Sequence, residues 1–256
     1  SIRGYSAGTG EERAKDIMDM FKDNLVKAIW CIRGGDTSSH VVDKLDFDII
    51  KENPKIFVGY SDVTNLHVLF NQRCNLVTFH GPMVSSNMLE SYDDFTRTSF
   101  EKALNMEDEL VLENPKGEDF KVMNSGHAEG IIVGGNLSLL ASMIGTPYEV
   151  DTAKKILFIE DVNEDVESLD RMMYQLKYSG KLDDSVGIII GDFKNCINKH
   201  DKYYTTERMF EEVLSNYKKP IMINIKSGHC HPMATIPLGA FCTMDTDSNK
   251  IVFSRS

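Results

Sequence analysis

The sequence predicts an α/β protein with two domains, each built around parallel strands. Short apolar segments alternate along the chain with segments of helical periodicity, and polar or glycine-rich turns follow the apolar ones. This alternation is typical of parallel sheets, whose functional groups gather at the carboxyl ends of the strands. The composition changes between residues 105 and 129, which indicates a boundary. With 256 residues, of which 41% are hydrophobic, the chain is long enough for two domains.

The N-terminal domain is expected over residues 1–110. Thr9 and Glu12 have the spacing of a capping box, which predicts a helix that ends near Phe21. An open parallel sheet normally begins with a strand, whereas this chain opens on a loop and a helix. We therefore expect either that the edge strand is absent or that the first strand–helix unit of this domain is missing. The other predicted elements are strands at 28–32, 56–58 and 76–79 and helices at 38–45 and 62–73.

Residues 111–128 are expected to form an interdomain crossover, because they are polar and rich in turn-forming residues. The C-terminal domain is expected over residues 129–256. Its predicted elements are strands at 130–133, 155–159, 186–190 and 221–223, helices at 137–144, 166–178 and 205–217, and a strand-rich tail at 235–253.

Charge and composition exclude several classes of partner. Lys and Arg number 28 against 39 Asp and Glu, so the net charge is −11. An acidic chain without a basic tract is unsuited to binding nucleic acid or an anionic membrane surface. No apolar run approaches the roughly 20 residues that span a bilayer, and the first residues lack the apolar stretch of a signal peptide. The five scattered cysteines indicate free thiols and a cytoplasmic location.

Ser61 lies in the turn Gly59-Tyr60-Ser61-Asp62, between a predicted strand and a predicted helix. A serine in such a turn has an exposed hydroxyl, and the backbone N–H that follows it can face a developing oxyanion. Val63 occupies the position where a hydrolase elbow has its second glycine, so the α/β-hydrolase pattern is not met. On the local pattern alone, Ser61 or Asp62 as a helix cap is the commoner alternative.

Two further turns follow predicted strands and leave alternatives open. Arg33-Gly34-Gly35-Asp36 has the composition of an anion-binding nest, and a plain strand-to-helix turn fits equally well. Glu160-Asp161 has the chemistry to orient a histidine, to bind a metal or to cap a helix, although a solvated turn is the commoner outcome.

The turn Ser227-Gly228-His229-Cys230-His231 supplies a candidate general base, His229, because an imidazole titrates near neutral pH. The spacing of these histidines and the cysteine matches no common zinc pattern, so no metal and no cofactor are predicted. His67 lies near an apolar helical stripe and is interpreted as structural. Asn136, after Gly134-Gly135, is interpreted as a helix cap.

The chain resembles the LD-carboxypeptidase family of serine peptidases over nearly its whole length. The matching segments occur in the family's order: AGTGEERA (7–14), AIWCIRGGD (28–36), FVGYSDVTNLH (57–67), TFHGPM (78–83), EGIIVGGNLSLLASMIGTPYE (129–149), ILFIEDVNEDVESLDRMMYQLKYSG (156–180), GIIIGDF (187–193) and SGHCHP (227–232). The resemblance implies a flavodoxin-like N-terminal sheet, a swivelling β/α C-terminal domain and an active site between the two.

The same resemblance assigns a Ser–His–Glu triad to Ser61, His229 and Glu160, and it selects Glu160 over Asp161 and His229 over His231. It places the oxyanion amides at Gly35 and Asp62, and substrate binding at Arg33 and Gly34. Asp36 and Thr37 depart from the residues that commonly follow this turn in the family, so the rim of the pocket is expected to differ.

The function implied is that of a cytoplasmic, homodimeric enzyme that releases the terminal D-alanine from murein tetrapeptides during cell-wall recycling. One alternative is a microcin C immunity-type peptidase, which shares the triad and cleaves aminoacyl-nucleotide analogues. Arg33 favours the first, since the immunity branch tends to vary there. A second alternative is a non-catalytic binding protein on the same fold, against which an intact Ser61, Glu160 and His229 argue.

Overall fold

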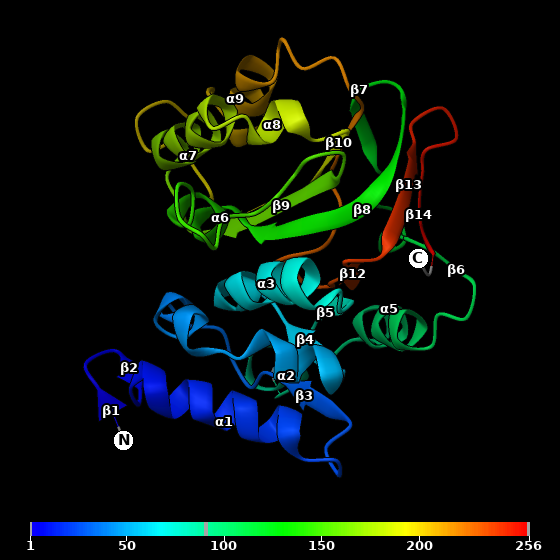
Figure 1. Cartoon of the computed structure of the whole chain (residues 1–256). Helices are drawn as coiled ribbons and strands as arrows, with labels where there is room; N and C mark the ends of the chain where they lie inside the picture. The colour runs from blue at the N-terminus through cyan, green and yellow to red at the C-terminus, as the bar shows by residue number, and fades with distance from the viewer. Residues whose placement is uncertain (1, 90–91, 255–256) are drawn as a thin grey trace.

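The computed structural model describes residues 2–89 and 92–254 and shows a mixed α/β protein (Figure 1). A four-stranded sheet has the order β12-β5-β4-β3, an eight-stranded sheet has the order β6-β14-β13-β8-β9-β10-β11-β7, and a short hairpin, β1 (Ile2–Arg3) and β2 (Ser6–Ala7), precedes them. No helix within the described residues is both long enough and apolar enough to cross a bilayer.

The four-stranded sheet has three parallel strands, as predicted, and one antiparallel strand at its edge. The helix α1 (Gly10–Lys22) opens on the expected capping box, because the Thr9 and Glu12 side chains each accept the other residue's backbone N–H. The strands are β3 (Ala28–Trp30), β4 (Ile56–Gly59), β5 (Thr78–His80) and the antiparallel β12 (Ile236–Leu238). The other helices here are α2 (Phe47–Glu52), α3 (Thr64–Cys74) and α5 (Asp94–Leu104).

The helix predicted over 38–45 is wrong in type, because the segment forms two 3₁₀ turns. They are η1 (Ser38–His40) and η2 (Val42–Lys44). The backbone N–H and hydroxyl of Ser38 donate to Asp62, which lies far away in the sequence. The periodicity of a short segment does not reveal a contact between residues so far apart in the sequence. Single turns also form at η3 (Ser61–Val63) and at the π-type turn η4 (Val84–Met88).

The eight-stranded sheet is parallel at its centre and antiparallel at both edges. The central parallel strands are β8 (His127–Asn136), β9 (Ile156–Val162), β10 (Gly187–Lys194) and β11 (Ile221–Ile223). The antiparallel strands are β6 (Glu109–Val111), β7 (Lys121–Asn124), β13 (Phe241–Asp245) and β14 (Lys250–Ser254). The helices are α6 (Leu137–Ser142), α7 (Val166–Tyr178), α8 (Lys181–Asp184) and α9 (Thr206–Val213).

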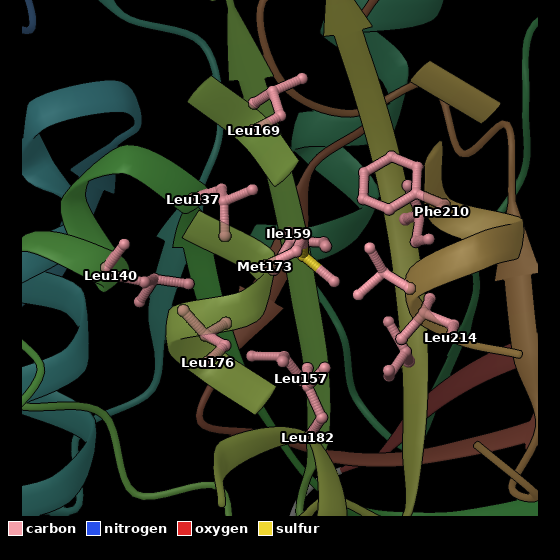
Figure 2. Packing of buried hydrophobic residues seen from close by; sticks show 14 of the residues in the cluster. Leu137, Leu140, Leu157, Ile159, Leu169, Met173, Leu176, Leu182, Phe210 and Leu214 are labelled. Atoms are coloured by element: carbon pink, nitrogen blue, oxygen red, sulfur yellow. The ribbon is translucent and has the colours of Figure 1, made fainter. Parts of the chain in front are cut away.

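A cluster of buried apolar side chains packs these helices against the sheet (Figure 2). Leu157 and Ile159 point from β9 toward Leu169, Met173 and Leu176 of α7, and all five side chains have no exposed surface. The spacing of the three α7 residues places them on one helical face. Full burial of each such side chain contributes about 1.5–3 kcal/mol, which keeps the carboxyl end of β9 rigid.

The segment expected as a crossover begins at the last residue of β6 and contains β7, and both strands belong to the eight-stranded sheet. β6 lies at one edge of that sheet and β7 lies at the other. In addition, β12 comes from the C-terminal range but pairs with β5 of the four-stranded sheet, with Ile236 opposite His80. Strand pairing joins residues that are distant in sequence, so turn composition alone does not reveal it. The domain boundaries themselves remain a prediction.

Helix α3 lies between the two sheets and contacts both β5 and β8 (Figure 1). The sequence predicts a single apolar stripe on this helix, whereas the structure buries it on nearly all sides. Its buried polar residues have partners: Asn65 donates to Ser38 Oγ, and the ring nitrogens of His67 bond to Thr78 Oγ1 and to the Gly59 carbonyl. The turn before α3 is therefore held at the junction of the sheets.

Candidate active site

Ser61 occupies a strained turn at the carboxyl end of β4. Its backbone φ is +64°, in the left-handed region, where a non-glycine residue costs of order 1–3 kcal/mol. Gly59 makes this turn possible, because a Cβ at that position would lie 3.0 Å from Val63 Cγ2 and 3.1 Å from Cys31. The space that Gly59 leaves is therefore filled by the side chain of Val63, the residue that replaces the usual second glycine. The geometry is that of a nucleophile elbow.

This strain predicts an unusual order of stability among variants at position 61. Both Ser61→Gly and Ser61→Ala remove the hydroxyl, but only glycine adopts a positive φ without penalty. We expect Ser61→Gly to be more stable than Ser61→Ala by about 0.5–1 kcal/mol, after the greater chain entropy of unfolded glycine is subtracted. Urea unfolding of both variants measures the difference. A more stable alanine variant would contradict a strained Ser61.

The glycines of the Arg33-Gly34-Gly35 turn lie against the elbow. A Cβ at Gly34 would lie 3.0 Å from Ser61 Cβ and 3.1 Å from Ser61 Oγ, and a Cβ at Gly35 would lie 3.2 Å from Asp62 Oδ2. A side chain at Gly34 would crowd the serine hydroxyl, and one at Gly35 would crowd the Asp62 carboxylate. The Gly35 N–H donates no hydrogen bond to any described residue. The turn that lies against Ser61 through Gly34 thus carries an unpaired backbone donor at Gly35, the kind of group that an oxyanion pocket uses.

His229 and Glu160 form a hydrogen-bonded pair at the other side of the site. The distance between His229 Nδ1 and Glu160 Oε2 is 2.7 Å, and the two side chains are 16% and 0% exposed. An ionised carboxylate only accepts hydrogen bonds, so it holds the proton on Nδ1 and leaves Nε2 able to take one. Burial raises the pKa of the Glu160 carboxyl, and the hydrogen bond from His229 opposes that shift.

Gly228 allows the pair to form. Its φ is +127°, and a Cβ there would lie only 2.7 Å from Glu160 Oε2. Any other residue would therefore displace the carboxylate that His229 contacts. The Tyr60 ring meets the His229 ring edge-on, with centroids 4.9 Å apart. The residue before Ser61 thus touches the histidine and joins the two halves of the site.

Asp161 points away from His229 and serves another element. Its carboxylate accepts hydrogen bonds from Asn136 Nδ2 at 2.9 Å, and from the N–H and hydroxyl of Ser138 at 2.9 and 2.7 Å. Neighbouring residues of a strand face opposite sides, which is why only one of the two acidic residues reaches the histidine. Asn136 also caps α6 through Leu139 N–H, as its position in the sequence indicates.

The structure therefore brings the predicted site residues into two contacting groups. Gly34 and Gly35 lie against Ser61 and Asp62, while Glu160 bonds to His229. Within the described part of the chain, Ser61 Oγ and His229 are not hydrogen bonded to each other.

The sequence analysis missed Tyr60 and the second role of His67. Tyr60 lies inside the GYSD turn, so its position next to Ser61 was the available signal. His67 Nε2 lies 2.9 Å from the Gly59 carbonyl and thereby supports the elbow from below. His80 is fully buried beside Tyr60, with ring centroids 5.7 Å apart. Burial lowers the pKa of His67 to about 4 and that of His80 well below its usual value, so neither is a proton acceptor at neutral pH.

The histidines and the cysteine after β11 differ in how far they are exposed to solvent. Cys230 is buried and His231 is exposed, and burial raises the pKa of the Cys230 thiol to about 12. A metal-binding cysteine must be a thiolate. Across residues 2–89 and 92–254, no group of three or more His, Cys, Asp or Glu side chains is arranged to hold a metal ion.

Comparisons with known proteins identify the family of the chain. Residues 1–81 match the LD-carboxypeptidase N-terminal domain, and residues 129–244 match the LD-carboxypeptidase C-terminal domain. A probable murein peptide carboxypeptidase of Bacillus subtilis is 42% identical, over 97% of this chain and 78% of that protein. The microcin C7 self-immunity protein MccF of Escherichia coli is 29% identical, over 96% of this chain and 79% of that protein.

Solved structures share the whole fold. The crystal structure of muramoyltetrapeptide carboxypeptidase from Oxalobacter formigenes matches with a TM-score of 0.87 and 28% identity, over 98% of this chain and 86% of that one. Wild-type MccF without ligand matches with a TM-score of 0.90 and 27% identity, over 99% and 84% of the two chains. The chain thus belongs to the LD-carboxypeptidase family and is a serine-type carboxypeptidase.

Proposed function

We propose that this protein hydrolyses the amide between an L-centre diamino acid residue and the terminal D-alanine of murein tetrapeptides, in the recycling of cell-wall fragments. The likeness to a probable murein peptide carboxypeptidase supports this substrate. A cytoplasmic location and a homodimeric state are part of the same proposal and rest on the family resemblance.

The observation that carries the proposal is the buried Glu160–His229 pair beside the strained Ser61 turn. A base oriented by a carboxylate, a partly exposed serine on an elbow and an unpaired backbone N–H are the three parts that serine peptidases need. They come from separate segments of the chain, and Tyr60 joins them by its contact with His229.

We infer a reaction in which these residues act in turn. Ser61 Oγ attacks the carbonyl carbon of the L-centre residue while His229 Nε2 takes the hydroxyl proton. The N–H groups of Gly35 and Asp62 stabilise the tetrahedral oxyanion, an effect worth about 3–4 kcal/mol for each donor. His229 then gives the proton to the leaving nitrogen, D-alanine departs, and water hydrolyses the acyl-serine by the same steps. Glu160 stabilises the imidazolium throughout.

Arg33 is the residue we assign to the substrate's terminal carboxylate. Its side chain is exposed and makes no ion pair with any described residue. It directly precedes Gly34, which lies against Ser61. A guanidinium at that position can hold a carboxylate through two parallel hydrogen bonds, and carboxypeptidase action requires recognition of the chain terminus. Gly34 shapes the same subsite by having no side chain.

The test is incubation of the purified protein with a disaccharide tetrapeptide, followed by mass analysis of the products. We expect loss of one alanine and recovery of free D-alanine. Two controls define the bond: the same peptide ending in L-alanine, and the pentapeptide ending in D-alanyl-D-alanine. Both should stay intact if the enzyme recognises an L–D amide.

The alternative activities give different results in the same assay. Hydrolysis of an aminoacyl sulfamoyl adenosine without release of D-alanine would favour an immunity-type peptidase. The immunity protein MccF is similar to this chain in sequence and in fold. Binding of either compound without hydrolysis would favour the non-catalytic protein.

We predict that the activity needs no metal. The described residues hold no metal-binding cluster, and the buried Cys230 thiol resists ionisation. Treatment with EDTA and subsequent dialysis should leave the rate of D-alanine release unchanged. Inhibition that added zinc reverses would contradict this and would implicate Cys230 and the two histidines beside it.

A further inference from the structure

The Asp62 side chain links the turn that carries Ser61 (residues 59–62) to the segment after the glycine turn (residues 33–36). Asp62 directly follows Ser61 and is only 7% exposed. Its Oδ2 accepts the N–H groups of Thr37 and Ser38, each at 3.0 Å, and its Oδ1 accepts the Ser38 hydroxyl at 2.8 Å. Every one of these donors belongs to the segment that follows Gly34 and Gly35.

The turn Arg33-Gly34-Gly35 is held by its two ends. On its N-terminal side, the Ile32 carbonyl accepts the Ser85 N–H and hydroxyl, each at 2.9 Å. Residues 33–36 form neither helix nor strand, and Arg33, Gly35 and Asp36 are exposed. From outside, Arg13 of α1 donates to the hydroxyl and carbonyl of Thr37, at 2.9 and 3.2 Å. From the elbow side the attachment is Asp62, supported by Asn65, which donates to Ser38 Oγ at 2.9 Å.

The Asp62 carboxylate lies beside the proposed oxyanion pocket, where a negative charge is unfavourable. A negative charge next to the oxyanion pocket opposes the charge that develops in the transition state. The three donors from Thr37 and Ser38 offset its burial. The role that remains for the carboxylate is structural. By binding Thr37 and Ser38, it holds the segment that includes Gly35 close to the Ser61 turn. Stabilisation of an oxyanion depends steeply on such distances.

We propose that Asp62 is a positioning residue whose carboxylate sets the distance between the Gly35 N–H and Ser61 Oγ through its hydrogen bonds to Thr37 and Ser38. This rests on the proposed roles of Ser61 as nucleophile and of Gly35 as oxyanion donor. The backbone N–H of Asp62 serves the oxyanion in that mechanism, whereas the side chain acts only through the turn that it holds.

The chemistry of the contacts predicts a particular order among variants. In Asp62→Asn with the amide oxygen at the Oδ2 position, that oxygen still accepts the Thr37 and Ser38 N–H groups, and the new amide N–H₂ donates to Ser38 Oγ. The second contact of the Ser38 N–H, to Oδ1 at 3.1 Å, is the one that this variant loses. That variant therefore keeps the turn in place without the charge. Asp62→Ala loses every contact. We expect kcat to fall by about 10²–10³ in Asp62→Ala, the range seen when one oxyanion donor is lost, and by less than about tenfold in Asp62→Asn.

Asp46→Ala is the matched control for stability. Asp46 caps α2 by accepting two backbone N–H groups, of Asp48 and Ile49 at 3.1 and 3.2 Å, and has no contact with the site. It should lower the unfolding midpoint by an amount comparable to Asp62→Ala, while kcat at a temperature where both are folded stays at the wild-type value. A KM change below about fivefold in Asp62→Ala would place the loss in the transition state.

The experiment measures kcat, KM and unfolding midpoint for the wild type and these three variants, with D-alanine release as the assay. Labelling of Ser61 by a fluorophosphonate is followed in parallel, because this reagent needs the nucleophile and its oxyanion pocket but no murein substrate. If the wild type labels rapidly but releases no D-alanine, the proposed substrate is wrong and the order of labelling rates still tests Asp62.

Three results would overturn the proposal. Equal losses in Asp62→Asn and Asp62→Ala would show that the charge acts rather than the hydrogen bonds. An unchanged kcat with a raised KM in Asp62→Ala would show that the turn serves only substrate binding. A wild type that neither labels nor releases D-alanine would remove the nucleophile on which the inference rests.

Discussion

Replacing Ser61 with alanine should abolish D-alanine release, to below about 0.1% of the wild-type rate, because no other group can form the acyl-enzyme. The side chain is small and partly exposed, and its hydroxyl makes no hydrogen bond with another described residue, so its loss removes little packing. Steady-state kinetics and circular dichroism of the variant test both statements.

The control is Ser85→Ala, which removes a hydroxyl of the turn after β5 that donates to the Ile32 carbonyl at 2.9 Å. It should keep most of the activity. A folded Ser61→Ala that retains more than a few per cent of the wild-type rate would exclude Ser61 as the nucleophile.

Glu160→Gln should lower kcat by orders of magnitude while the protein stays folded. The amide has nearly the same shape as the carboxyl but cannot stabilise the imidazolium, and it can present N–H₂ to His229 Nδ1, which favours the wrong tautomer. Asp161→Asn should keep kcat within about tenfold of wild type but lower stability by about 1–2 kcal/mol, because Asp161 holds the start of α6 through Ser138.

The raised pKa of Glu160 adds a pH signature to this comparison. Burial disfavours the charged form of Glu160 in the folded state, so the wild type loses stability as pH rises above the usual carboxyl range and through the folded pKa. Glu160→Gln has no such titration. Its unfolding midpoint relative to wild type should therefore increase from acidic to neutral pH.

Kinetics and unfolding midpoints of Glu160→Gln and Asp161→Asn across this pH range provide the test. An inactive Asp161→Asn beside an active Glu160→Gln, both folded, would mean that the acidic partner of His229 has been misassigned. A midpoint difference that does not change with pH would contradict the raised pKa.

The local elements were predictable because their signals lie within a few residues. The capping box starts α1 at the expected place, α7 spans Val166–Tyr178 and β11 spans Ile221–Ile223, as periodicity and turn residues predict. Boundaries were less accurate where strands continue into functional residues: Glu160 and Asp161 belong to β9 itself and do not form a turn after it.

The sequence by itself determined the alternation of strands and helices, the short polar turns at strand ends and the family resemblance that selects Ser61, Glu160 and His229. Only the tertiary structure decided which of these turns meet. Glu160 and His229 are 69 residues apart, and Asp62 and Thr37 are 25 apart, yet each pair is hydrogen bonded. Burial between two sheets and pairing across strands create these contacts, and both depend on residues that no local window of sequence contains.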